Sequence, residues 1–375
     1  MRRDWCSRSY KVRFVTPAFL GGADQSAQWR VPPFKALLRH WWRIVWWASA
    51  AEKSIGKLRE EERCWFGSSA ENETGASKIR IWLKEWSGPV MRKDQFNRLD
   101  FGTVRHPEVN RNISAALYLG YGAVNWNKAA RSAQLVRSSA LGLNGDQELR
   151  LAFPKHISGQ VDAASRMIAL FGCLGGRSRN GWGSISLKEC RRDGEMAALV
   201  QEEFFDEENQ TSRGWLRGMA VELDDALKRD WCHALGKDRQ GRLLLWRTER
   251  KKRWEEVLAQ LAEVKIGLRT QFHFKGAGPH NTLCDRQLLA YPVTNHGLQA
   301  WGNSARSANQ LVFKVHAVDG GYVGVVVHLP HSLPAPLMSR LEEQLQLKKA
   351  QVYAREKGLW NKVHKYLDSK LTRLS

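Results

Sequence analysis

Alternation of apolar and polar residues marks the first element of the chain. Val12 and Phe14 alternate with polar neighbours and predict a strand at 10–15. At 77–86 the alternation places apolar residues on one face and basic and aromatic residues on the other. That second face fits either a nucleic-acid platform or a solvated sheet surface. In order, the first half is predicted to contain a strand at 10–15, a helix at 33–48, strands at 77–86 and 148–153, a helix at 160–171 and a strand at 183–188.

The segment at 87–115 shows no clear period and is expected to be a long irregular insertion. The second half has weaker patterns, and its best signal is the turn Asp319-Gly320-Gly321 between two β-rich runs, which is typical of a hairpin. Its predicted elements are helices at 215–228 and 250–261, strands at 265–274, 311–318 and 322–329, and a last amphipathic helix that begins near Leu337.

The helix at 33–48 carries a basic stripe beside its apolar face. Lys35, Arg39 and Arg43 are spaced by four residues and therefore lie along one side of the helix. Arg30 precedes the helix, and a turn at Gly21-Gly22-Ala23-Asp24 comes before Arg30. Such a helix is suited to pack on a sheet and to present its cations to phosphates.

A glycine-rich loop follows the helix at 160–171. The run LFGCLGGRSRNGWGSISL includes Gly175, Gly176, Arg177 and Arg179. A dinucleotide site requires strand, glycine loop and helix in that order, whereas here the order is helix, loop and strand. Glycines beside arginines allow the backbone to approach phosphates closely. The alternative is a glycine-rich hairpin with solvated arginines.

Composition narrows the class of partner. The net charge is +21 and the excess of basic residues runs along the whole chain, which favours nucleic acid over a membrane surface. No stretch is long and apolar enough for a membrane span or a signal peptide, so a cytoplasmic protein is expected. The six cysteines form no Cys-x-x-Cys pair, and we expect no structural metal and no cofactor.

Two segments resemble one known family. Tyr10 to Arg43 reads as a strand, then TPAFLGGAD, then Arg-x-Pro-x-x-Lys-x-x-x-Arg-x-Trp-Trp-Arg, and Leu170 to Ser186 is the glycine-rich loop. Both are similar to the first subunit of the type III-B CRISPR (Cmr) effector complex, in the RAMP superfamily. The resemblance implies an α+β fold with two ferredoxin-like (RRM-like) domains in tandem, the second degenerate, with helical insertions. The expected divisions are a first domain at 1–190, an acidic linker at 191–213 and a second domain at 214–375.

The resemblance also implies a function. The protein is expected to be a non-catalytic, RNA-binding subunit that holds the 3′ part of the guide RNA or the guide–target duplex through backbone contacts. Its partners would be CRISPR guide RNA, target RNA and the other subunits of the Cmr complex, with no membrane involved. The residues expected to contact RNA are Arg30, Lys35, Arg39, His40, Arg43, Gly175, Gly176, Arg177 and Arg179.

Three alternatives stay open on sequence grounds. Some RAMP relatives cleave RNA without metal by using a histidine as general base, and His40, beside Arg39, is the best candidate here. A backbone subunit of another type III complex is the second, and Asp94 or Asp100 in the insertion would then be candidates for target cleavage. The third is an architectural RNA-binding protein outside CRISPR systems.

Overall fold

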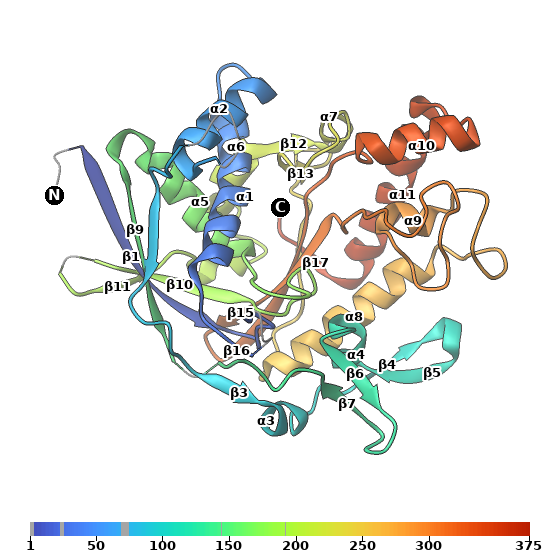
Figure 1. Ribbon diagram of the computed structural model, residues 1–375, viewed down its shortest axis with the longest axis horizontal. Helices are drawn as coiled ribbons and strands as arrows, with labels where there is room; N and C mark the ends of the chain where they lie inside the picture. Colours follow the sequence, from blue (N-terminus) through green and yellow to red (C-terminus); the bar gives the residue numbers. More distant parts are fainter. Residues whose placement is uncertain (1–3, 23–25, 69–74, 144, 192) are drawn as a thin grey trace.

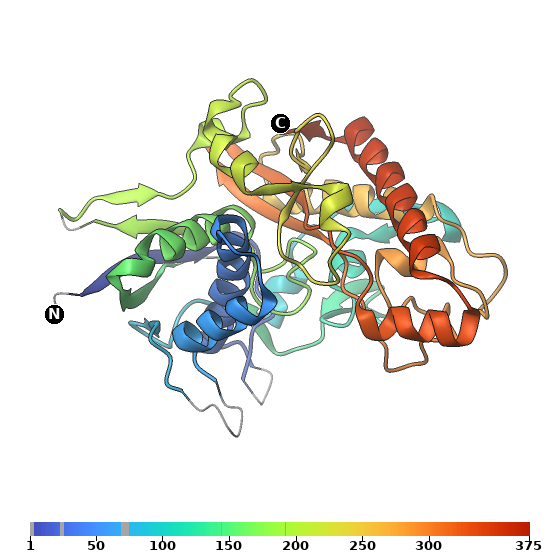
Figure 2. The same ribbon diagram turned by 90° about the horizontal axis from the view of Figure 1, so that it is seen from above.

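The computed structural model describes residues 4–22, 26–68, 75–143, 145–191 and 193–375. The chain is mixed α/β, and the largest sheet of each half is antiparallel and has helices packed on it (Figure 1). Seen from above, the two halves lie side by side, with the N-terminus at the outer edge of the first (Figure 2).

The first sheet has five strands in the order β11-β10-β1-β9-β2. Helices α1 and α5 contact each other and cover one face of this sheet (Figure 1). Tyr10, Val12 and Phe14 are buried, whereas Lys11 and Arg13 alternate with them on the opposite face. The six elements predicted for this half are present: β1 (Trp5–Phe14), α1 (Val31–Ser49), β2 (Arg80–Leu83), β9 (Gln147–Pro154), α5 (Ser158–Phe171) and β10 (Ile185–Cys190), while β11 (Met196–Ala198) adds an edge.

The insertion between β2 and β9 is built from short hairpins rather than one irregular loop. Its strands have three or four residues each, which is too short for alternation to stand out in the sequence. Its elements are β3 (Val90–Arg92), α3 (Lys93–Asn97), β4 (Thr103–His106), β5 (Arg111–Ser114), α4 (Ala115–Gly120), β6 (Val124–Asn127), β7 (Ser132–Leu135) and β8 (Ser139–Leu141). A further helix, α2 (Ile55–Phe66), follows α1 and packs against it.

The second sheet has four strands in the order β15-β16-β14-β17, and the predicted hairpin is present as β15 and β16. In each half the last strand of the unit, β10 or β17, pairs with the first strand, β1 or β14. The second half comprises α6 (Gly214–Met219), β12 (Ala220–Glu222), α7 (Leu223–Ala226), β13 (Leu235–Lys237), β14 (Leu245–Arg247), α8 (Trp254–Thr270), α9 (Asp285–Leu289), β15 (Leu311–Val318), β16 (Gly321–His328), α10 (Ala335–Leu345), α11 (Lys349–Lys370) and β17 (Thr372–Arg373).

The strand predicted at 265–274 is wrong. Helix α8 continues through that segment to Thr270. Val264, Ile266 and Leu268 are all buried, because this helix is enclosed on several sides rather than on one stripe. A helix that is buried on nearly all sides has apolar residues at many positions. Over a few residues these can alternate with polar ones as they do in a strand.

The two halves are joined by hydrogen bonds between β15 and the segment that contains α5 and the glycine-rich loop. Val315 N donates to Ser184 Oγ at 2.9 Å, and Phe313 N donates to Arg179 O at 3.1 Å. Burial lowers the pKa of Lys314 to about 7, and its Nζ donates to Ile168 O at 3.1 Å. Among the described residues, no helix combines the length and apolar character needed to cross a bilayer.

Candidate nucleic-acid interface

The two segments singled out in the sequence lie against each other. Thr16 Oγ1 donates to Gly181 O at 2.7 Å, and Gly183 N donates to Pro17 O at 2.9 Å. Further along, Gly176 N donates to Phe19 O at 2.9 Å. The end of β1 and the glycine-rich loop therefore form one structural unit, although about 160 residues separate them in the sequence. Ala23 and Asp24 of the predicted turn lie outside the described residues.

Gly175 has a structural role that the sequence did not reveal. Its φ is +94°, and a Cβ placed there would lie 2.9 Å from the carbonyl carbon and oxygen of Phe19. Only glycine allows this approach without strain. Gly176 is exposed, but its N–H already pairs with Phe19. The contact of these two glycines with RNA stays a prediction.

We expect Gly175→Ala to lower the free energy of unfolding by about 2–3 kcal/mol, because a backbone clash adds to the strain of a positive φ. Gly194→Ala is the matched control, since Gly194 has φ +86° but no described atom lies within 4 Å of a Cβ placed there. Urea denaturation of both variants measures the difference. Equal losses in the two variants would show that the contact with Phe19 has no energetic importance.

The basic stripe of α1 is present but partly paired. Arg39 Nε and Arg43 Nε each lie 2.5 Å from Glu62 Oε1 of α2. Burial raises the pKa of Glu62, but the hydrogen bonds from the two arginines outweigh that effect and lower it. One carboxylate thus faces two guanidinium groups, so the cluster keeps a net positive charge. The arginine side chains are 40 % and 37 % exposed, which leaves room for an anion.

Arg30 and Lys35 are at the beginning of the same helix. Arg30 precedes the first turn, and its Nη1 donates to Gly21 O at 2.9 Å. This contact links the start of α1 to Gly21. Lys35 is half-buried, and burial together with the charge of Arg39 lowers its pKa. The basic stripe therefore begins at Arg30, beside Gly21, and runs along α1.

Arg43 and Arg179 both affect the pKa values of His40 and Cys232, where α1 meets the second half. Burial, then the charges of Arg179 and Arg43, lowers the pKa of His40 to about 4, so His40 is neutral at pH 7. Burial also raises the pKa of Cys232 to about 11, against the opposing charges of the same two arginines. Arg179 Nη1 donates to Asn309 O. Both arginines therefore lie close enough to His40 and Cys232 to act on their pKa values, and their contact with RNA stays a prediction.

Arg177 points elsewhere. It is exposed with φ +57°, and its Nε donates to Tyr121 O at 2.6 Å, at the end of α4. Arg177 therefore contacts the end of α4, whereas Lys35, Arg39 and Arg43 lie along α1.

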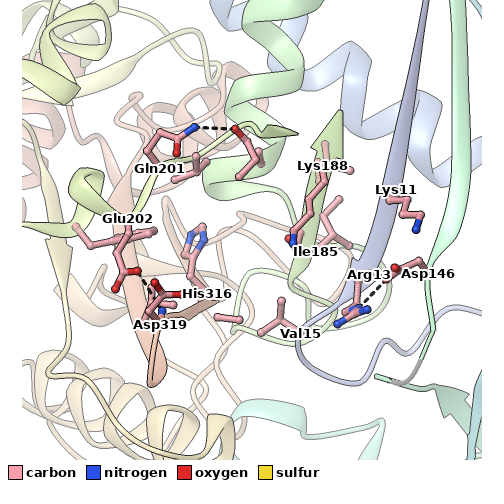
Figure 3. A pocket seen from close by; sticks show the side chains of 18 residues that line it. Lys11, Arg13, Val15, Asp146, Ile185, Lys188, Gln201, Glu202, His316 and Asp319 are labelled. Atoms are coloured by element: carbon pink, nitrogen blue, oxygen red, sulfur yellow. Dashed lines mark hydrogen bonds and ion pairs between the residues drawn. The ribbon is translucent and has the colours of Figure 1, made fainter. Parts of the chain in front are cut away.

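A pocket of about 470 Å³ adds cations that the sequence reading missed (Figure 3). Lys11 and Arg13 of β1 and Lys188 of β10 form one wall, and Glu202 and Asp319 stand across from them (Figure 3). Arg13 Nε lies 2.6 Å from Asp146 Oδ1, whereas neither lysine has an acidic partner within the described ranges. The alternation at 10–15 was the available signal, because it places residues 11 and 13 opposite Val12.

The open face of the first sheet continues this basic surface. Lys11 lies opposite Lys188 in the pairing of β1 with β10. On β2, Trp82 is 40 % exposed, and Arg80 stacks over the ring of Trp5 at 5.2 Å. The aromatic and basic face predicted for 77–86 therefore lies on this exposed surface, and a base can stack on such a side chain.

Comparisons with known proteins find a family match in the first half. The sequence model of the RAMP superfamily matches residues 11–186, which include β1, α1, α5 and the glycine-rich loop. No curated protein sequence matches the chain. Apo Cmr1 from Pyrococcus furiosus is similar in structure, with 17 % identity, a TM-score of 0.48, and coverage of 98 % of this chain and 97 % of that chain. A chain of the type III-B Cmr-beta complex bound to cognate target RNA has 12 % identity, a TM-score of 0.44, and coverage of 96 % and 100 %.

Proposed function

Because residues 11–186 match the sequence model of the RAMP superfamily, we propose that the protein is a non-catalytic RNA-binding subunit of a type III-B (Cmr) CRISPR effector complex. It holds the 3′ part of the guide RNA, the guide–target duplex, or both, and its partners are these RNAs and the other subunits. The observation that carries the proposal is the packing of the glycine-rich loop on the segment that follows β1, together with the charges of Arg43 of α1 and Arg179 of the loop that both act on His40.

We infer that each half is a ferredoxin-like unit, the second degenerate, joined by an acidic segment at 191–213. The strand orders support this reading, because β10-β1-β9-β2 and β17-β14-β16-β15 place corresponding strands at corresponding positions. The order of elements along the chain supports it as well, since a helix follows the first strand and another precedes the last strand in both halves. We propose divisions at 1–190 and 214–375, with β11 of the acidic segment extending the first sheet.

The chemistry of the surface fits backbone recognition. Guide pairing supplies sequence selection in such complexes, so the protein needs charge, shape and stacking rather than base-edge contacts. Guanidinium groups suit this task, because they donate two hydrogen bonds to one phosphate. The proposed contact residues are Arg30, Lys35, Arg39, His40, Arg43, Gly175, Gly176, Arg177 and Arg179, with Lys11 and Lys188 on the open sheet face.

The salt dependence of binding tests this proposal. Affinities of the purified protein for single-stranded RNAs of unrelated sequence should agree within a few-fold and fall steeply with salt. The slope of log K against log salt changes by about 0.7 for each phosphate neutralised on a single strand. Fluorescence anisotropy over a range of salt concentrations measures both quantities. A strong preference for one sequence, with a shallow slope, would contradict backbone recognition.

A further inference from the structure

A separate cavity of about 730 Å³ lies in the region of the β4–β5 turn, the end of α8 and α9. Its lining includes the charged and aromatic residues His106, Glu108, Arg269, Phe274, Arg286 and His296. None of these residues belongs to the interface described above. The cavity is in the range that small ligands occupy in proteins.

Two of its lining side chains are nine-tenths buried and have an unpaired polar atom. His106 is 8 % exposed and Arg286 is 9 % exposed. No described residue offers a hydrogen bond to His106 Nδ1 or to Arg286 Nε. An unpaired buried polar group is unfavourable, and a charged one more so. Both side chains line the cavity, although each unpaired atom is itself covered by protein.

One side chain in the cavity, that of Glu108, carries a negative charge. Glu108, in the β4–β5 turn, accepts a hydrogen bond from Arg286 Nη1 and lies 3.9 Å from His273 Nδ1. Burial raises the pKa of Glu108, but the hydrogen bond from Arg286 outweighs it and keeps the carboxyl ionised. Arg269 brings a second guanidinium group to the cavity. Two arginines and one displaceable carboxylate make a site for an oxyanion.

A stack of aromatic rings lies beside these cations. His280 Nε2 and His296 Nδ1 are 2.9 Å apart, with their rings 11° from parallel. The ring of Phe274 stacks on His296 with centroids 3.9 Å apart and an angle of 3°. Arg286 Cζ lies 5.5 Å from the centre of the Phe274 ring. An aromatic plane beside guanidinium groups is suited to a base attached to a phosphate.

We propose that this cavity binds one nucleotide of an RNA strand, with its phosphate replacing the Glu108 carboxylate on Arg286 and its base against Phe274 and His296. The choice of RNA rests on the proposed function. Val109, at the cavity's edge, is 49 % exposed, so the site opens to solvent and a continuous strand can enter it. In this account Glu108 is an internal substitute for the phosphate and competes with it.

Glu108→Gln in the full-length chain tests the competition. The glutamine side chain keeps an acceptor for Arg286 but loses the negative charge, so affinity for a labelled single-stranded RNA of about 20 nucleotides should rise. Asp224→Asn is the matched control, because the Asp224 carboxylate is 27 % exposed, close to the 29 % of Glu108, and also binds two cations. We expect a gain of about fivefold over this control, corresponding to the net value of about one hydrogen bond.

A second pair of variants keeps the test independent of folding. Arg269→Gln or Phe274→Leu, each added to Glu108→Gln, should remove the gain, and AMP alone should bind far more weakly than RNA. Equal affinities of Glu108→Gln and Asp224→Asn would overturn the proposal, as would tight AMP binding with no change for RNA. Failure of the proposed function gives a different result, because the unmodified protein would then not bind RNA at all.

Discussion

Lowering the pH from 7 to 5 is expected to destabilise the protein by several kilocalories per mole. His233, His316, His328 and His364 are all buried. Burial lowers the pKa of His233 to about 4 and, with the charge of Arg373, that of His364 to about 3. An unfolded histidine titrates near 6.5, so the unfolded chain binds more protons between these values. The contribution of these histidines to the free energy of unfolding is therefore fully present above about pH 6.5. It is lost as the pH falls toward the pKa of the folded state.

Each fully buried histidine contributes about 2 kcal/mol to this loss at pH 5. Glu356 acts in the opposite direction, because burial raises its pKa to about 8 and its folded form stays protonated. His328 and His364 also interact, with His364 Nε2 3.0 Å from His328 Nδ1, so their contributions are not additive. A net loss on the order of 4 kcal/mol remains.

Urea denaturation at pH 7 and pH 5 measures the loss. His233→Gln should remove about one histidine's share of the pH dependence, whereas His273→Gln should leave it unchanged, because the His273 side chain is 74 % exposed. The same free energy of unfolding at both pH values would mean that the buried histidines are solvated or paired in ways the structure does not have.

Removal of both Arg43 and Arg179 is expected to weaken RNA binding about 100-fold at roughly 0.1 M salt. A hydrogen bond to a charged group contributes about 1.5–3 kcal/mol, which is at least about tenfold for each arginine. The salt slope should fall by about 1.4 in the double alanine variant if each arginine contacts one phosphate of a single strand. Fluorescence anisotropy with unrelated RNA sequences measures both effects, and the losses should be similar for all of them.

Arg355→Ala is the control for these variants. Its side chain is 38 % exposed, against 37 % for Arg43, and it also pairs with one carboxylate, that of Asp285. It should change RNA affinity by less than about twofold, since Arg355 belongs neither to the proposed contact residues nor to the lining of the cavity near α9. The double lysine variant should recover part of the affinity through charge alone. Equal losses in the control and in Arg43→Ala would assign the effect to net charge rather than to this interface.

The strongly periodic elements of the first half were predictable. The alternation at 10–15 and the apolar face at 33–48 each reflect an element with one buried side, and both elements are present. The strand predicted at 265–274 is wrong because α8 is buried on several sides, so its sequence lacks a single apolar stripe. The hairpin of β4 and β5 within 87–115 is held by pairing between strands of four residues, and such pairing leaves almost no local signal.

The candidate site, too, was predictable from the sequence only in part. The spacing of Lys35, Arg39 and Arg43 was sufficient to predict one basic side of α1. Their pairing with Glu62 was not predictable, because it depends on how α2 packs against α1. The contact of Gly175 with Phe19 is likewise a tertiary approach between segments far apart in the chain. Composition and spacing report local geometry, whereas partners across the fold require the coordinates.

One gel tests the central claim most directly. The purified protein is mixed with labelled CRISPR guide RNA, alone and paired with a complementary target RNA, with and without magnesium. The account predicts a shifted band that contains intact RNA under all conditions. Discrete cleavage products that form without metal and disappear in His40→Ala would contradict it, because the protein would then be an endoribonuclease rather than a binding subunit.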